Sequence, residues 1–422
     1  MLSYARPNAG SAKGVRVSSR IVSLDKQPQM TERARRRSIV LFSASMIFFW
    51  ASLYIYVPIL SVYANFLGAA PAVVGLVVGV YGFSQLVVRI PLGLWSDHLG
   101  KRKPFVVMGM FLAAAGCLAM VLTPDPWYLV GGRAVIGLAA ATWVCSTVLF
   151  SSYFPLSQAV KAMGLATFFS SAPQIATSWA GGYLAESYGW TFPFYVGIGL
   201  AALGLIGVIG VEEVPIRRPQ SISWERFRRI GTTPLLVAVS AIGILNHFSI
   251  FATTYTFVPI YATSLGASKS DLGTILTASM VASSAATLIA FRVSNRFGDG
   301  ATVTAGMVIG GLITLATPLV GDLWVLTALQ FGNGVARGLI YPVLMGLCVR
   351  MVSAKDRATS VGIFQASYAL GMFTGPFLGG VIVEQAGLAS MFVVMGLVSL
   401  LGAMLSAWGI RVSLRALALD SH

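Results

Sequence analysis

The chain has 422 residues, of which 56% are hydrophobic and only 10% are charged, and its formal net charge is +15. Soluble proteins carry about 25% charged residues, so the composition argues against a soluble enzyme and indicates a protein that crosses a membrane several times. The sequence pI near 10.0 is also typical of nucleic-acid-binding proteins. The placement of the basic residues therefore decides between these two classes.

Apolar segments follow one another along the whole chain, and each is long enough for a transmembrane helix of roughly 20 residues. We predict an all-α integral membrane fold with twelve transmembrane helices and no large soluble domain. The predicted spans are 38–64, 72–95, 104–123, 127–150, 162–184 and 192–211 in the first half, and 234–262, 271–291, 302–320, 324–348, 359–383 and 388–410 in the second.

The basic residues lie almost entirely on one side of these spans. With the N-terminus in the cytoplasm, 25 of the 29 Lys and Arg residues fall in cytoplasmic tails and loops, and only Lys269 lies outside. This asymmetry is the positive-inside pattern. It predicts a multi-pass protein of a cell membrane, such as a prokaryotic inner membrane, with both termini cytoplasmic, and it explains the pI without nucleic acid.

The N-terminal segment 1–37 combines nine basic residues with scattered Ser, Gly and Pro. Such a composition cannot bury enough apolar surface to fold, so we predict a disordered basic cytoplasmic tail, and translation from Met1 or from Met30 both stay open. The other predicted units are an N-terminal six-helix bundle (38–211), a cytoplasmic linker (212–233), a C-terminal six-helix bundle (234–410) and a cytoplasmic tail (411–422).

The two halves of the chain are copies of each other. A shift of 198 residues aligns Leu67-Gly68-Ala69 with Leu265-Gly266-Ala267 and Gly181-Gly182 with Gly379-Gly380. Because six spans return the chain to its starting side, the copies keep the same orientation. Two parallel bundles of this kind commonly enclose a site at the middle of the membrane, so the repeat predicts a transporter.

The loop after the second span reads Gly93-Leu-Trp-Ser-Asp97-His-Leu-Gly100-Lys101-Arg102. It resembles the signature loop of the major facilitator superfamily, and Arg133 followed by Gly137 resembles that family's motif in the fourth span. The resemblance implies a twelve-span secondary transporter in which Asp97 contacts the start of span 11 and closes the cytoplasmic side. Alternatively, Asp97 only offsets Lys101 and Arg102.

The second copy of this loop is degraded, because Asn295 stands at the position aligned with Asp97. An amide can cap a helix but lacks the charge, so we predict an asymmetric gate. The residues assigned to this conformational gate are Gly93, Asp97, Gly100, Lys101, Arg102, Asn295 and Gly298.

Span 11 carries glycines at every fourth position, a spacing that permits close helix contact in lipid, together with a proline that favours a bend. The residues predicted to pack helices are Gly137, Gly371, Gly375, Pro376, Gly379 and Gly380. Span 5 has no Gly-Pro pair at the corresponding place, so the motif does not establish export.

Polar residues recur at helical spacing in several spans, and together they predict a central cavity. An arginine inside the membrane costs about 2.5 to 3.5 kcal/mol unless it faces protein or water. The predicted substrate-cavity residues are Tyr56, Gln85, Arg89, Arg133, Gln174, Asn246, His247, Asn333, Arg337, Tyr341 and Gln365.

Some of these residues have a second interpretation. Arg133 can brace helices, Arg89 can belong to the cytoplasmic gate, and His247 can be a hydrogen-bonded core histidine. All 14 Asp and Glu residues lie in tails, in loops or at the ends of predicted spans, and none lies in the middle of the membrane. An interior with arginines and no acid suits an anionic, zwitterionic or neutral substrate better than a cation.

We therefore predict a secondary active transporter that moves a small amphiphilic, anionic or neutral organic solute by alternating access, with proton-coupled efflux. The alternatives are an uptake symporter of the same fold, and a transporter-like receptor or lipid-handling protein without coupled flux. The sequence holds no set of nucleophile, base and acid and no metal-ligand cluster, so we expect no enzymatic activity, cofactor or metal. The expected partners are the lipid bilayer, a small-molecule substrate and protons, with no nucleic acid and a monomeric chain.

Overall fold

The computed structural model describes residues 30–213, 224–350, 352–353 and 356–410. Every regular element in these ranges is a helix, and ten helical segments are long and apolar enough to cross a membrane. The long helix α7 (Ala159–Tyr188), which is rich in Ser and Thr, supplies a further span, and the 52-residue segment Thr359–Ile410 turns at Gly387 and supplies two. The fold is therefore the predicted all-α arrangement of twelve spans.

The N-terminal bundle contains six spans, two of which are built from two consecutive helices. Its elements are α1 (Glu32–Tyr54), α2 (Val57–Phe66), α3 (Pro71–Leu99), α4 (Lys103–Leu122), α5 (Pro126–Ala141), α6 (Trp143–Ser152), the short η1 (Leu156–Gln158), α7 and α8 (Phe192–Ile209).

The C-terminal bundle follows a connecting helix, α9 (Trp224–Gly231). Its elements are α10 (Pro234–Ala252), η2 (Thr253–Phe257), α11 (Val258–Ser264), α12 (Lys269–Phe297), α13 (Asp299–Ala316), η3 (Thr317–Leu319), α14 (Leu323–Arg350), α15 (Arg357–Leu405) and η4 (Ser406–Ile410).

The first span of each bundle is interrupted at the same place. Helix α1 ends at Tyr54, three residues before α2 with Pro58 at its start, and α10 passes into η2 before Pro259. A proline offers no N–H to the carbonyl four residues earlier, which here belongs to Tyr54 or Tyr255. Both tyrosines consequently lie where the helix is locally distorted.

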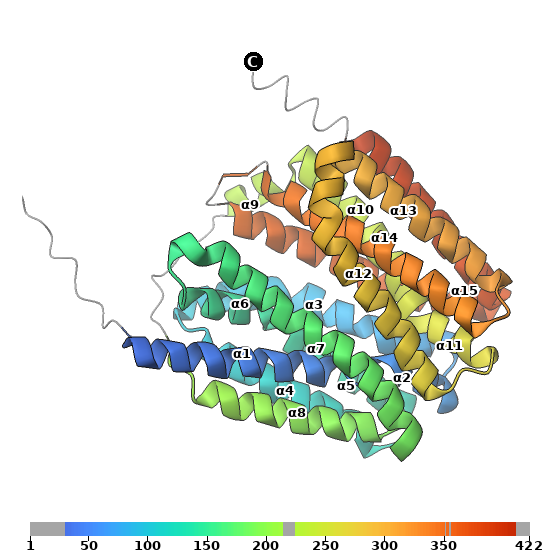
Figure 1. Cartoon of the computed structure of the whole chain (residues 1–422), viewed down its shortest axis with the longest axis horizontal. Helices are drawn as coiled ribbons and strands as arrows, with labels where there is room; N and C mark the ends of the chain where they lie inside the picture. The colour runs from blue at the N-terminus through green and yellow to red at the C-terminus, as the bar shows by residue number, and fades with distance from the viewer. Residues whose placement is uncertain (1–29, 214–223, 351, 354–355, 411–422) are drawn as a thin grey trace, which may run out of the picture.

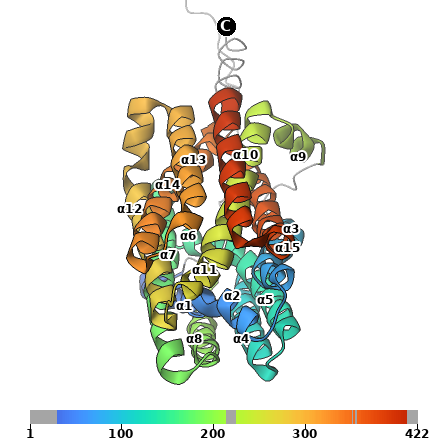
Figure 2. The same cartoon turned by 90° about the vertical axis from the view of Figure 1, so that its right-hand side faces the viewer.

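The two bundles lie side by side with their helices roughly parallel (Figure 1). We call the side on which α1 begins and α3 ends the α1 side, and the opposite side, on which α2 ends and α3 begins, the far side. Helices α2 and α11 meet at the far side, at the centre of the view from that direction (Figure 2). The most extensive contacts between the bundles are those of α3 with α15 and of α7 with α12.

The helix ends differ from the sequence predictions in detail. Helix α1 begins at Glu32, where Thr31 caps it by accepting the N–H of Ala34, so residues 32–37, predicted as part of a disordered tail, are helical. The 212–233 linker contains the helix α9. The predictions for residues 1–29, 214–223 and 411–422 lie outside the described residues.

Candidate functional site: a cavity between the bundles

A cavity of about 950 Å³ lies between the two bundles. It extends from Tyr255 and Met372 near the middle of the spans to Met163 in the first turns of α7 and Val349 at the end of α14. Because those helix ends lie on the α1 side, the cavity opens there. Its polar lining residues include Gln85, Arg89, Gln174, Asn246, His247, Arg337, Tyr341 and Gln365, all of which were predicted from the sequence.

Arg89 lies on α3 in the wall of this cavity and is only 8% exposed. Its Nε and Nη1 atoms are buried and have no hydrogen-bond partner. Over the described residues, no carboxylate forms an ion pair with it. A buried donor without a partner costs free energy, and over the described residues no carboxylate offsets the positive charge of Arg89.

Arg337 enters the cavity from α14, in the opposite bundle, and is held by two neutral groups. Its Nε donates to Ser283 Oγ at 3.3 Å and its Nη1 donates to Tyr255 Oη at 3.1 Å. Gly334 and Gly338, on either side of it, lie against the backbone carbonyls of α12, where a larger side chain would collide. The two glycines thus bring α14 close enough to α12 for Arg337 to reach Ser283.

His247 lines the cavity on α10 and stacks on the ring of Tyr368, with ring centroids 4.1 Å apart. Its Nδ1 lies 2.8 Å from the carbonyl oxygen of Gly243. Because a carbonyl only accepts hydrogen bonds, Nδ1 carries the hydrogen and Nε2 is left as an acceptor. The histidine therefore has both a fixed orientation and a nitrogen that can take a proton.

Three residues predicted for the cavity lie elsewhere, and two of them are hydrogen-bonded to each other. Arg133 donates from Nη1 to Tyr56 Oη at 3.0 Å, and its guanidinium lies 4.2 Å from the ring centroid of Tyr81. Both Arg133 and Tyr56 are buried inside the N-terminal bundle and are absent from the cavity wall. Their placement matches the second interpretation of Arg133, which braces helices; the residue that separates it from the cavity is Tyr81.

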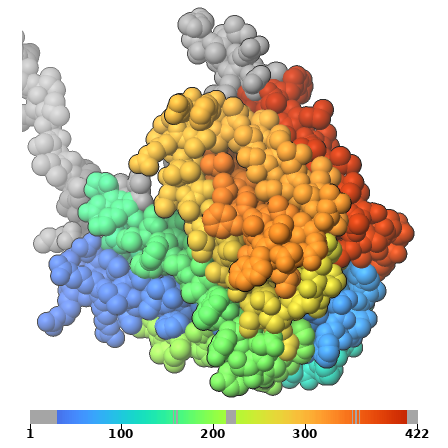
Figure 3. All heavy atoms as spheres, turned by 45° about the vertical axis from the view of Figure 1, so that its right-hand side comes forward, coloured from blue at the N-terminus to red at the C-terminus, as the bar shows by residue number. Residues whose placement is uncertain are grey.

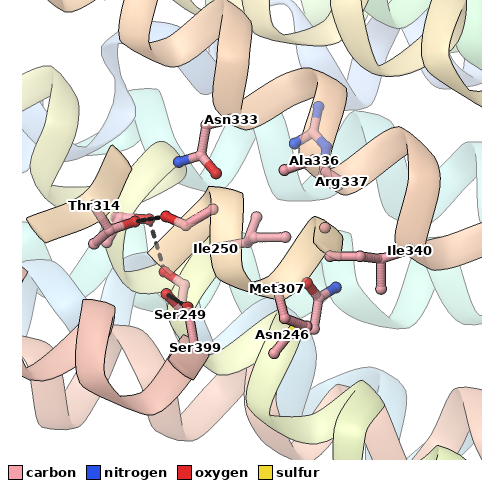
Figure 4. A pocket seen from close by; sticks show the side chains of 13 residues that line it. Asn246, Ser249, Ile250, Met307, Thr314, Asn333, Ala336, Arg337, Ile340 and Ser399 are labelled. Carbon is pink, nitrogen blue, oxygen red and sulfur yellow. Dashed lines mark hydrogen bonds between the residues drawn. The ribbon is translucent and has the colours of Figure 1, made fainter. Parts of the chain in front are cut away.

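Asn333 lines a separate small pocket of about 10 Å³ inside the C-terminal bundle, together with Ser249 and Thr314 (Figure 4). Asn246 and Arg337 border both this pocket and the large cavity. The Asn246 Nδ2 has no protein partner, and a polar space of this size holds about one water molecule. Asn333 thus lines the small pocket and not the large cavity, which the sequence pattern alone could not show.

The loop between α3 and α4 folds back onto its own bundle. Arg102 donates to Asp97 and to Ser96, and Gly100 takes the left-handed conformation (φ 67°) that ends α3. Lys101 is exposed, and a Cβ atom added at Gly93 would have no neighbouring atom within 4 Å. In this structure the α1 side is open, and Asp97 pairs with Arg102, as its second interpretation expects.

The second copy of the loop uses a different acid. Asn295 is exposed, and Gly298 (φ 91°) ends α12, but Asp299 accepts hydrogen bonds from Ser294 and, at 2.6 Å, from Arg350 Nη1. The sequence comparison singled out Asn295 and overlooked Asp299. The alignment of Ser294 with Ser96 marks the corresponding loop position and could have drawn attention to Asp299 beside it.

The glycines of α15 face two different helices. Gly371 and Gly375 lie against the backbone of α10 at Ile244 and Phe248. A Cβ atom added at Gly379 would lie 3.3 Å from the Cβ of Ala252, so this glycine also packs on α10. Gly380 instead faces the start of α3, and the Pro376 carbonyl lies against Gly75.

In the N-terminal bundle, Gly137 of α5 packs on Tyr81 and Ser84 of α3. These close contacts depend on missing side chains, as the spacing predicted.

The Major Facilitator Superfamily model matches residues 42–261 and 239–419. The chain belongs to the Major Facilitator Superfamily. This is a family of membrane transporters and not of enzymes.

Among curated members, the chain is 26% identical to the inner membrane transport protein YajR of Escherichia coli, over 78% of this chain and 73% of that protein. It is 25% identical to the multi-drug resistance efflux pump PmrA homolog of Lactococcus lactis, over 82% and 88%. It is 24% identical to a chloramphenicol efflux pump of Mycobacterium tuberculosis, over 84% and 88%.

Among solved structures, a bacterial homolog of the human lysosomal transporter Spinster matches with a TM-score of 0.79 at 15% identity, over 92% of this chain and 99% of that one. The nucleoside transporter NupG matches with a TM-score of 0.69 at 15% identity, over 87% and 98%. At these identities the structures support the fold.

Proposed function

We propose that this superfamily member exports an amphiphilic organic anion by alternating access. The observation that carries the proposal is the pair Arg89 and Arg337, which face one cavity from opposite bundles. Among the residues that the structure describes, the lining of that cavity includes no Asp or Glu. An anion placed between the two arginines would contact both bundles at once and would supply the negative charge that the wall lacks.

The wall of the cavity suits the apolar part of such a substrate. Trp50, Trp143, Phe168, Phe251 and Tyr255 contribute aromatic surface from both bundles. Ligand sites are commonly apolar pockets with a few polar groups that fix the orientation. An aromatic or aliphatic body with one acidic group is therefore the substrate class that the cavity matches best.

Export and proton coupling are the proposed direction and energy source. Two of the relatives described above are efflux pumps, and His247 provides a titratable group in the cavity wall. Protonation of His247 would add positive charge near Arg337 and favour an anion, and a proton and an anion bound together move in the same direction. Export driven by an inward proton gradient therefore requires that His247 take its proton only after the anion has left. In this arrangement the α1 side faces the cytoplasm and the structure is open inward.

The orientation is tested by labelling single cysteines in intact cells. Lys101→Cys lies on the α1 side and Lys269→Cys on the far side. A membrane-impermeant maleimide should label position 269 and leave position 101 unlabelled. The reverse result would place the α1 side outside the cell and contradict the proposed orientation.

The substrate class is tested with a pair of probes that differ only in charge, 2-naphthoate and 2-naphthamide, binding to purified protein. The anion should bind at least about tenfold more tightly, because hydrogen bonds to charged groups contribute about 1.5 to 3 kcal/mol. Arg89→Gln and Arg337→Gln should each remove this preference, while Arg292→Gln, an exposed arginine on α12, should keep it. Equal affinity for the two probes would contradict the anion assignment and leave a neutral solute.

A further inference from the structure

The far side is closed by two interfaces that are residue-by-residue copies of each other. In one, Gly380 of α15 lies against the backbone of Pro71 and Ala72 at the start of α3. In the other, Gly182 of α7 lies against the backbone of Lys269 at the start of α12. The shift of 198 residues that relates the two halves converts Gly182 into Gly380 and Pro71 into Lys269.

A second pair of contacts obeys the same shift. Gly75 of α3 lies against the carbonyl of Pro376, and Gly273 of α12 lies against the carbonyl of Ser178. Positions 75 and 178 of the first half correspond to 273 and 376 of the second. Both interfaces therefore use the same packing, and the joined surfaces of α7 and α12 are visible in Figure 3 as green against gold.

Each interface also has a carboxylate on a helix N-terminus of the opposite bundle. Glu384 Oε1 of α15 accepts the backbone N–H of Ala72 at 2.9 Å. Glu186 Oε2 of α7 accepts the backbone N–H of Lys269 at 2.8 Å. Positions 186 and 384 are again 198 residues apart. The two N–H groups belong to the first turns of α3 and α12, where no helical carbonyl is available to them.

We propose that Glu186 and Glu384 form a paired latch that holds the far side closed and favours the state open to the α1 side. A carboxylate is attracted to the positive end of a helix, and here each attraction joins one bundle to the other. When the transporter opens to the far side, α3 must separate from α15 and α7 from α12, so both contacts must break. The latch acts on the conformational equilibrium itself and requires no particular substrate.

Two other acids on the far side provide matched controls. Asp125 accepts the N–H of Trp127 at 2.7 Å, and Asp322 accepts the N–H of Trp324 at 2.8 Å. Each caps a helix of its own bundle, so its contact is present in both conformations. Neutralising these acids should affect helix stability without changing which side is open.

The test measures far-side opening by the distance between two spin labels. The labels replace Phe66 in the N-terminal bundle and Trp324 in the C-terminal bundle, both exposed, in a background whose three buried cysteines are alanine. Glu186→Gln and Glu384→Gln should each raise the ratio of far-side-open to far-side-closed molecules about threefold, and the double variant about tenfold, because the contacts are separate. Asp125→Asn should leave the ratio unchanged.

A second set of variants removes the donor and leaves the acid in place. Lys269→Pro deletes the N–H that Glu186 accepts, at a first helical position that tolerates proline and that is Pro71 in the other half. Ser268, which precedes it, already has the extended conformation (φ −73°, ψ 166°) that a following proline requires. Lys269→Ala keeps the N–H while removing the side chain, which lies over Trp190.

Lys269→Pro should open the far side about as much as Glu186→Gln, and the two changes together should add nothing further. Lys269→Ala should open it less. The latch is refuted if both glutamine variants keep the parent's distance distribution, or if Asp125→Asn or Lys269→Ala changes it as strongly as they do. Because label distances are measured without substrate, this outcome is independent of whether the protein transports anions.

Discussion

Replacing Arg89 by methionine should change the thermal stability of the protein in the opposite direction from replacing Arg337 by methionine. We expect Arg89→Met to raise the thermal stability of the protein, because Arg89 is 8% exposed and two of its side-chain nitrogens are buried without a partner among the described residues. We expect Arg337→Met to lower it, because that change breaks hydrogen bonds to Ser283 and Tyr255. Both variants should lose affinity for an organic anion.

The expected magnitudes follow from these contacts. A buried donor without a partner costs about 1 to 3 kcal/mol, so removing the Arg89 guanidinium should stabilise the fold by about 2 kcal/mol. For a bundle of this size that raises Tm by roughly 4 to 8 °C. The two bonds of Arg337 are donated by a charged group and contribute about 1.5 to 3 kcal/mol each, so Arg337→Met should lower Tm by at least several degrees.

The protein carries its own reporters for this measurement. Cys117, Cys145 and Cys348 are buried, so a thiol-reactive dye reports their exposure as the protein unfolds. Binding of 2-naphthoate is measured on the same samples below Tm. An Arg89→Met variant that unfolds earlier than the parent would show that the guanidinium has stabilising partners and would refute the uncompensated charge on which the anion site rests.

Four further outcomes are expected. Asp97→Asn should reduce transport strongly while Asn295→Ala reduces it little, measured as initial rates in proteoliposomes; equal rates would remove the asymmetric gate. His247→Gln, which cannot titrate, should flatten the pH dependence of transport, and a variant that still follows the pH gradient would assign coupling to another group. The pKa of Asp356 lies below its ordinary value because Ser353 Oγ and Arg226 donate hydrogen bonds to its carboxylate. The contact between Asp356 and Arg226 should therefore hold α9 in place at neutral pH, and it should weaken only as the pH falls below the ordinary carboxyl range. Hydrogen exchange of α9 amides should therefore change little from pH 7 to 5 after correction for intrinsic rates, but rise at pH 7 in Asp356→Asn; equal exchange in the variant would show that α9 is held by other contacts.

The spacing of polar residues along the helices predicted part of the cavity lining but not all of it. Helical spacing placed Gln85 and Arg89 on one face of α3, and both line the cavity. The same reasoning assigned Arg133 to the cavity, whereas the structure places it behind Tyr81 with Tyr56 as its partner. Periodicity gives the face of a helix but not the neighbour that covers that face, because the neighbour is set by packing between helices distant in the chain.

The sequence by itself determined the membrane class, the twelve spans and the twofold repeat, because hydrophobicity, span length and residue identity are properties of the chain alone. It also contained the relation between Glu186 and Glu384, which the shift of 198 residues makes visible. Only the tertiary structure showed that each of these acids meets a helix end of the opposite bundle. The same holds for the side on which the cavity opens, since a pattern along one helix carries no information about the relative position of two rigid bundles.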